Sequence, residues 1–329
     1  MIETIRKLVE AYGPSGHEDQ IRALILEEID GLADEVTVDA LGNVIAWKRS
    51  GREGAKKVML SAHMDEIGVM VTHVDEDGFL RFTGIGGVYA STLIGNRVRF
   101  ADGTVGAIGV EGDMNRKPAL SELYIDVSDG KNRKPRIRVG DAAGMVRDLV
   151  VRGDRLTAKS MDDRIGCAVQ IEVMRQLSGS PNDVAFVFSV QEEVGLRGAR
   201  TAAHAVDPDI GIAIDVTRTG DTPKGVKMDV KLGAGPAIKI KDSGMLAAPE
   251  VVALMEKAAR KARIPCQREV LVRGTTDAAA MQLVRAGVRA GCLSIPCRYV
   301  HTTSETVDLN DVQNAVKLLL TLLKEPVRV

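Results

Sequence analysis

Four short apolar segments each end in a group of polar residues, and this repeated pattern limits the possible folds more than any other feature. The segments are KKVMLSAHMD (56–65), VAFVFSVQEE (184–193), IGIAIDV (210–216) and AGCLSIPCRYVH (290–301). Helical patterns separate most of them, at 162–177, 249–262 and 276–287. Strands that alternate with helices predict a three-layer α/β fold, in which a mostly parallel sheet has helices on both faces.

The polar residues at the ends of these segments are candidates for a functional site. In an open α/β sheet, ligands bind outside the carboxyl ends of the strands. We therefore expect the following side chains to gather at one edge of the sheet: His63, Asp65, Glu192, Glu193, Asp215 and His301.

The rest of the chain divides into an N-terminal region and an insertion. The first 50 residues predict a helix at 1–12, a GPSG turn, a second helix at 17–31 that Ser15 could cap, and the hairpin VTVDALGNVIAW. Between 67 and 157 the sequence changes to short β-rich stretches with frequent glycines. We expect an inserted, barrel-like β domain there, with 1–66 and 158–329 forming the catalytic domain.

Composition excludes several classes of partner. The 44 basic and 45 acidic residues give a net charge of -1, and no long run of like charge occurs, so we expect no nucleic-acid and no membrane partner. The four cysteines have no CxxC spacing, which predicts reduced thiols and a cytoplasmic protein. The N-terminus has the pattern of a folded helix and not of a signal peptide.

Each candidate residue also has an ordinary structural explanation. A single histidine such as His63 is more often structural than a ligand, although Asp65 could fix its tautomer. Glu192 and Glu193 repel each other at a buried strand end unless a cation or solvent compensates. Because neighbouring side chains of an extended chain point in opposite directions, one could bind metal while the other faces the substrate as a base.

The remaining candidates indicate a metal site only when they are considered together. Asp162 and Asp163 begin a helix, where aspartates commonly cap backbone amides. Asp215 closes an apolar strand, and His301 is ambiguous by itself. Together, two histidines and three carboxylates suit zinc, cobalt or manganese better than calcium or magnesium. One shared carboxylate could hold two ions close together.

The order of motifs resembles that of the M42 family of metallo-aminopeptidases, the glutamyl and tetrahedral aminopeptidases, some of which carry the label endoglucanase M. The resemblance covers nearly the whole chain, and the insertion between residues 65 and 162 favours M42 over the related M20 and M28 groups. The motifs that carry it are GPSGHE (13–18), SAHMDEIG (61–68), SMDDRIG (160–166), VQEEVGLRGA (190–199), AIDVTRTGDTP (213–223), LGAGPAIKI (232–240), GTTDAAA (274–280) and RYVHTTSE (298–305).

The resemblance implies a role for each site residue. Two divalent ions, zinc or cobalt with manganese as an alternative, would share Asp162; His63 and Asp215 would complete one site, and Glu193 and His301 the other. Asp65 would orient His63, and Glu192 would be the general base. Asp163 would have a local structural role, often beside a cis peptide. Two stretches depart from the common pattern, GTTDA with Thr275 in place of a glycine, and HTTSE.

The function implied is that of an aminopeptidase that releases N-terminal residues from short peptides. The resemblance also implies a homo-oligomer assembled through the inserted domain, from dimers up to twelve subunits. An M20-like deacylase or dipeptidase is the nearest alternative. An endoglucanase would need aromatic platforms that a chain with 3% aromatic residues hardly supplies. A non-enzymatic metal-binding scaffold would have no evident use for Glu192.

Overall fold

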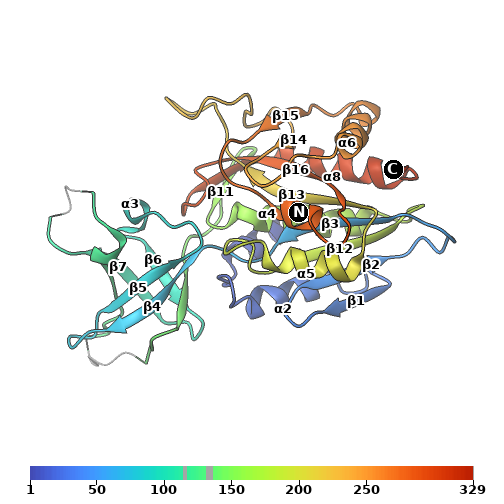
Figure 1. The fold of residues 1–329 in the computed structure, drawn as a ribbon. Coiled ribbons are helices and arrows are strands. Elements are labelled where there is room, and N and C mark those ends of the chain that lie inside the picture. Colours follow the sequence, from blue (N-terminus) through green and yellow to red (C-terminus); the bar gives the residue numbers. More distant parts are fainter. Residues whose placement is uncertain (114–116, 131–135, 329) are drawn as a thin grey trace.

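The chain forms an α/β body from which a β-barrel projects to one side (Figure 1). The structure is a computed structural model that describes residues 1–113, 117–130 and 136–328. Within these ranges, no helix combines the length and the apolar character that a membrane crossing requires.

The body is built on an 11-stranded mixed sheet. Its four central strands are parallel, as the sequence predicts, whereas the strands next to them on either side pair with them antiparallel. In spatial order the strands are β1 (Glu35–Val38), β2 (Val44–Lys48), β12 (Asp183–Ser189), β3 (Lys57–His63), β13 (Ile210–Thr217), β16 (Arg289–Arg298), β17 (Glu305–Asp308), β11 (Arg155–Ala158) and β10 (Val150–Arg152). Strand β14 (Ala237–Lys241) also pairs with β16, and β15 (Gln267–Val270) pairs with β14.

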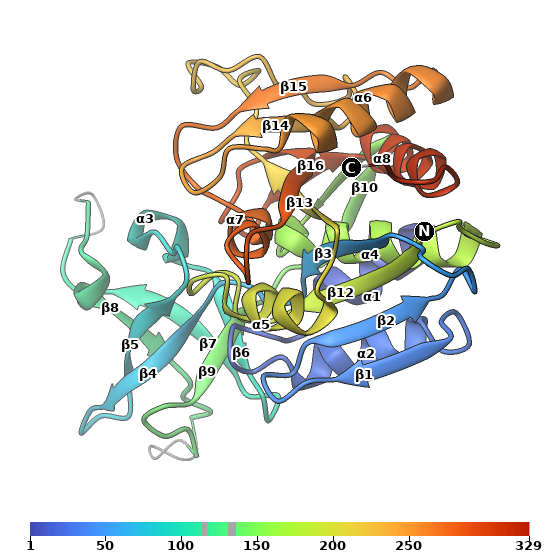
Figure 2. The same ribbon diagram turned by 45° about the vertical axis from the view of Figure 1, so that its right-hand side comes forward.

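Helices cover both faces of the sheet, which confirms the three-layer prediction (Figure 2). Helices α5 (Arg197–Val206) and α7 (Asp277–Gln282) pack on one face. The other face carries α1 (Ile2–Glu10), α2 (Asp19–Glu28), α4 (Met161–Gln176), α6 (Pro249–Ala262) and α8 (Leu309–Leu323).

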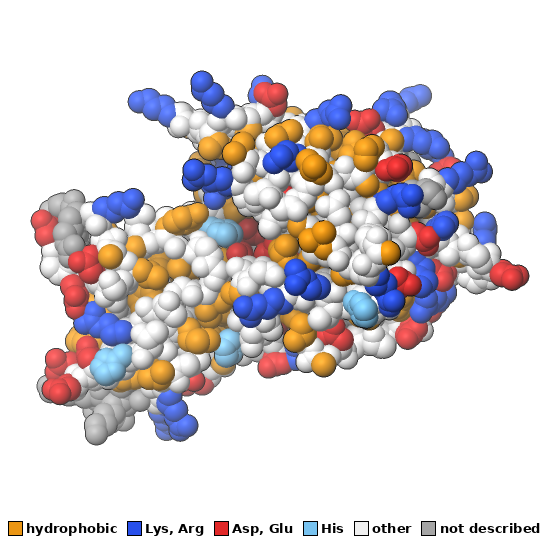
Figure 3. Space-filling model, viewed as in Figure 1, with side chains coloured by type: hydrophobic (Ala, Val, Ile, Leu, Met, Phe, Trp, Pro, Cys, Tyr) orange, Lys and Arg blue, Asp and Glu red, His pale blue; other side chains and the backbone are white. Residues whose placement is uncertain are grey.

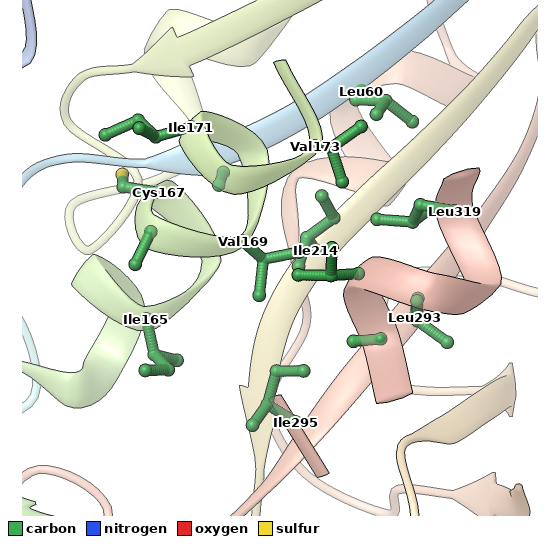
Figure 4. Close-up of a cluster of buried hydrophobic side chains, with 14 of the residues drawn as sticks. Leu60, Ile165, Cys167, Val169, Ile171, Val173, Ile214, Leu293, Ile295 and Leu319 are labelled. Atoms are coloured by element: carbon green, nitrogen blue, oxygen red, sulfur yellow. The ribbon is translucent and has the colours of Figure 1, made fainter. Parts of the chain in front are cut away.

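Helix α4 lies at the centre of the larger apolar core and is buried along most of its length. Figure 4 shows Val169 of this helix beside Ile214 of β13, with Leu293 of β16 and Leu319 of α8 close by. Each such side chain stabilises the fold by about 1.5–3 kcal/mol when it is removed from water. This packing fixes the start of α4, where Asp162 lies, against the ends of β3 and β13.

Two local predictions about helices are wrong. Ser15 does not cap α2, because its Oγ donates to Asp65 Oδ2 at 2.6 Å instead. The helix predicted at 276–287 ends at Gln282, since Arg285 and Gly287 take left-handed backbone angles. The predicted hairpin is present as β1 and β2, and Asp39 Oδ1 accepts bonds from the amides of its turn.

The inserted region contains a closed barrel with its own apolar core. Its strands are β4 (Gly68–Val74), β5 (Leu80–Ile85), β8 (Leu123–Asp126), β7 (Val105–Val110), β6 (Arg97–Phe100) and β9 (Ala142–Met145), and the short helices α3 (Ala90–Leu93) and η1 (Leu120–Glu122) accompany them. Strand β10 and all but the last residue of β11 also fall inside the expected insertion 67–157, but both strands belong to the sheet of the body through β17. The barrel strands therefore end at Met145.

Candidate metal centre

The predicted site residues meet at the carboxyl edge of the central strands. Parallel register places Ser189 of β12 opposite His63 of β3, so both strands end at one level. Asp162, Glu192, Glu193, Asp215 and His301 line a cavity of about 480 Å³. Figure 3 shows acidic side chains beside a histidine in the hollow between the body and the barrel.

The carboxylate of Asp162 lies between the two histidines. Its Oδ1 is 3.0 Å from His63 Nε2, and its Oδ2 is 3.3 Å from His301 Nε2. Two carboxylate oxygens that face two separate imidazoles are the arrangement expected of a ligand shared by two ions.

Both histidines are oriented by backbone carbonyls. His63 Nδ1 is 3.1 Å from the carbonyl oxygen of Asp65, whose carboxylate is farther away at 3.5 Å. His301 Nδ1 is 3.0 Å from the carbonyl oxygen of Gly87, in the barrel. If each Nδ1 donates, each Nε2 presents its lone pair to the centre, as a metal ligand must. Gly87 permits this approach, because a Cβ there would lie 2.5 Å from His301 Nδ1.

Glu192 and Glu193 occupy a turn and not a strand, so the extended-chain explanation of their opposite directions is wrong. Strand β12 ends at Ser189, and Gln191 has a left-handed φ of 54°. The two side chains still diverge: Glu192 Oε2 is 3.9 Å from His63 Nε2, and Glu193 Oε1 is 3.3 Å from His301 Nε2. Asp65 holds this turn by accepting from the amides of Glu192 at 3.0 Å and Glu193 at 3.2 Å.

Negative charge is concentrated here without enough compensation from the protein. Burial raises the pKa of Glu192, Glu193 and Asp215, and repulsion between neighbouring carboxylates raises these pKa values further. Burial opposes charge on His301, but the carboxylates of Asp162 and Glu193 raise its pKa to about 12. Within the described residues, the buried Glu193 Oε1 has no hydrogen-bond partner of good geometry. A bound cation would satisfy this oxygen and relieve the repulsion.

Two overlapping groups of side chains could each hold an ion. The ligand atoms of His63, Asp163 and Asp215 lie within 4.8 Å of one another, as do those of His63, Asp162 and Glu193. Asp163 was expected to be structural, and its carboxylate does accept bonds from the amides of His63 at 3.3 Å and Gly166 at 3.1 Å. The peptide bond between Asp162 and Asp163 is cis. Nitrogen and carboxylate donors in this combination fit zinc, cobalt or manganese.

Two further carboxylates belong to the site but were not singled out from the sequence. Glu305 accepts from the amide of His301 at 2.7 Å and from that of Asp162 at 3.0 Å, so it holds both ends of the cluster. Burial, with repulsion from Asp162, raises the pKa of Glu305 to about 8. Asp277 accepts from Ser61 at 2.7 Å and from Ser189 at 2.5 Å beneath the cluster. Both residues lie inside quoted motifs, RYVHTTSE and GTTDAAA.

Three basic residues also line the cavity. Arg218, Lys239 and Arg273 line it, and Lys239 is fully buried beside Glu269, with Lys239 Nζ 3.2 Å from Glu269 Oε1. Thr275, where the family pattern commonly has glycine, also lines the cavity. The lining of the cavity therefore includes both acidic and basic groups.

A histidine and carboxylate cluster at the carboxyl edge of a three-layer α/β sheet is typical of metal-dependent hydrolases. The family model described as M42 glutamyl aminopeptidase matches residues 42–318, and the chain belongs to this family. It is accordingly a hydrolase, a peptidase of the aminopeptidase type.

Named relatives agree with this assignment over nearly the full length of the chain. The lysyl aminopeptidase of Pyrococcus furiosus is 39% identical over 341 residues, covering 98% of this chain and 96% of its own. The solved aminopeptidase APDkam598 of Desulfurococcus kamchatkensis has a TM-score of 0.93 and 42% identity, covering 98% and 94%. The TET1 peptidase of Pyrococcus horikoshii, whose structure is described as assembling into a tetrahedron or a large octahedral shell, has a TM-score of 0.88 and 31% identity, covering 98% and 99%.

Proposed function

We propose that the chain is a two-metal aminopeptidase that removes N-terminal residues from short peptides, with Glu192 as the general base. The observation that carries this proposal is the Asp162 carboxylate, which faces His63 on one side and His301 on the other. Asp162 would bridge two ions, with His63 and Asp215 on one and Glu193 and His301 on the other. The natural ions would be zinc or cobalt, with manganese as an alternative.

Divalent ions bound there would supply the Lewis acidity that polarises a peptide carbonyl and lowers the pKa of a water. The protein's own residues do the rest. Glu192 lines the cavity and takes the proton from the attacking water, and it then passes this proton to the departing amine. The Asp65 carboxylate keeps Glu192 in place by accepting a hydrogen bond from its backbone amide. Gly87 and Glu305 orient His301. Free peptide N-termini, which are cationic, would be attracted to the carboxylates that line the cavity.

We also propose a homo-oligomer and a cytoplasmic location. The assembly described for the relative from Pyrococcus horikoshii supports oligomerisation, and a projecting barrel is a suitable contact element. The reduced state of all four cysteines supports a reducing compartment.

Removal of metal should abolish peptidase activity, because the carboxylates alone cannot activate the carbonyl. Chelated protein should be inactive on aminoacyl anilides and regain activity with zinc, cobalt or manganese, measured by anilide release. Soluble cellulose and N-acylated amino acids, tested in parallel, should not be cleaved. Full activity after complete chelation would contradict the two-metal function, and cleavage of acylated substrates alone would favour the M20-like deacylase.

Substitution of His301 should weaken metal binding more than it affects folding. His301→Ala removes a nitrogen that faces both Asp162 and Glu193, so metal content after dialysis should fall by roughly one ion per chain. Elemental analysis measures this content. His204→Ala, at an exposed position of α5, is the matched control and should keep the full metal content. An unchanged metal content in His301→Ala would remove this residue from the ligand set.

A further inference from the structure

Three consecutive backbone amides of the turn 191–193 are held by two buried carboxylates. The amide of Gln191 donates to Glu18 Oε1 at 3.1 Å, that of Glu192 to Asp65 Oδ1 at 3.0 Å, and that of Glu193 to Asp65 Oδ2 at 3.2 Å. Glu18 is only 4% exposed and Asp65 is fully buried. The turn that carries both site glutamates is thus fixed through its backbone by groups from elsewhere in the chain.

Both carboxylates are themselves anchored by the N-terminal segment 13–18, the GPSGHE motif. The amide of Gly16 donates to Glu18 Oε1 at 2.7 Å, and Ser15 Oγ donates to Asp65 Oδ2 at 2.6 Å. This segment pairs with the chain just after β3, since the amide of Ser15 donates to the carbonyl of Glu66 at 3.2 Å. Segment 13–18 therefore links the end of β3 to the turn after β12.

The turn needs such support, because its backbone is not in a relaxed conformation. Gln191 has a φ of 54°, a left-handed conformation that a side chain with a Cβ adopts only at a cost in energy. Such conformations persist when the surroundings hold them. The hydrogen bond from the amide of Gln191 to Glu18 holds the backbone at this residue. If Gln191 took an ordinary backbone conformation instead, Glu192 and Glu193 would point in other directions.

We propose that Glu18 and Ser15 are positioning residues for the peptidase reaction, which fix the turn 191–193 so that Glu192 and Glu193 keep their places. Glu18 is not among the residues that line the cavity, and it acts on the turn through the amide of Gln191. This role rests on the proposed function, in which Glu192 is the base. A displacement of about 1 Å in a reacting group can lower the rate by about 100-fold.

The test compares Glu18→Ala with Glu18→Gln in the metal-loaded protein. Glu18→Ala should lower kcat by about 100-fold with little change in KM, because binding of the substrate is not altered. Glu18→Gln should restore kcat to within about tenfold of the original, since one oxygen, Oε1, accepts both bonds and an amide oxygen can replace it more weakly. Ser15→Ala, which removes only a hydroxyl, should lower kcat by a smaller factor.

A second measurement does not depend on activity. Hydrogen exchange of the metal-free protein should show faster exchange at residues 190–196 in Glu18→Ala, because the turn has lost its support. Asp19→Ala is the control: Asp19 follows Glu18 at the first position of α2, its side chain is 85% exposed, and its loss should leave both kcat and exchange unchanged.

The proposal is overturned if Glu18→Ala keeps its kcat, if Glu18→Gln is as slow as Glu18→Ala, or if exchange at 190–196 is unaltered. Glu192→Gln is assayed beside these variants. An active Glu192→Gln would refute the base but not the support of the turn, which the exchange measurement decides separately.

Discussion

Glu192→Gln should bind metal normally and lose about 10²- to 10⁴-fold in kcat, the range that general acid–base catalysis contributes. Among the described residues, Glu192 belongs to neither group of ligand atoms that could hold an ion, although it lines the same cavity. Burial and the nearby Asp215 and Glu193 raise its pKa well above the ordinary value for glutamate, which favours uptake of a proton. Glutamine has the same shape but cannot accept that proton. Steady-state kinetics on an aminoacyl anilide and elemental analysis measure the two quantities.

Glu193→Gln is the matched control, because it alters the adjacent residue by the same chemical change. Glu193 lies with His63 and Asp162 in a ligand group, so this variant should lose metal as well as activity. If Glu192→Gln lost as much metal as Glu193→Gln, Glu192 would be a ligand. A Glu192→Gln variant with unchanged kcat would mean that another group is the base.

The centre of the fold could be predicted from the sequence because local patterns determine it. Strands buried on both faces are continuous apolar runs, and β3, β12, β13 and β16 all have this character. Helix α6 has its predicted bounds, 249–262, since proline at its first position and a periodic apolar face mark it clearly. After Gln282, the last residue of α7, the apolar pattern continues. Val284 packs in the same apolar core as α7 but is not helical. Periodicity alone therefore overestimated the length of α7.

Elements whose pairing is distant in the sequence could not be predicted. Strand β10 is short and each of its residues is exposed, and β11 reaches the sheet only through β17, about half the chain away. Nothing local distinguishes these strands from those of the barrel, so the expected insertion 67–157 includes them.

The residues of the candidate site also fall into those that could be predicted from the sequence and those that could not. The proposed ligands are residue types with metal chemistry, four of them near strand ends and Asp162 at the start of a helix, so their types and positions identified them. Glu305 and Glu18 act by accepting bonds from backbone amides of distant segments, and their contacts exist only in the folded chain. Asp163 shows the reverse case, because a helix-start aspartate looked purely structural and proved to lie beside His63 and Asp215.

Glu66→Ala should destabilise the protein by about 3–5 kcal/mol, because it leaves buried cations without their partner. Glu66 Oε2 accepts from Lys159 Nζ at 2.6 Å, and its Oε1 accepts from the amide of Gly13 at 2.9 Å and lies 3.9 Å from Arg164. The side chains of Glu66, Lys159 and Arg164 are at most 3% exposed. Burial raises the pKa of Glu66, but Lys159 and Arg164 overcome this and lower it, so the Glu66 carboxylate is ionised at neutral pH. Urea unfolding of the metal-free protein measures the loss.

An exposed ion pair provides the comparison that separates burial from charge. Glu35 pairs with Arg49 at 3.1 Å, and their side chains are 52% and 40% exposed, so Glu35→Ala should cost less than about 1 kcal/mol. Combining Glu66→Leu with Lys159→Met should recover part of the stability lost in Glu66→Ala, since both charges of the pair are then removed together. Arg164 Nη1 also donates to the carbonyl of Leu8 at 2.6 Å, and none of these substitutions replaces either residue. A loss in Glu66→Ala no greater than that in Glu35→Ala would mean that water or other groups reach Lys159, and that the link between the segment 13–18 and the start of α4 does not depend on this carboxylate.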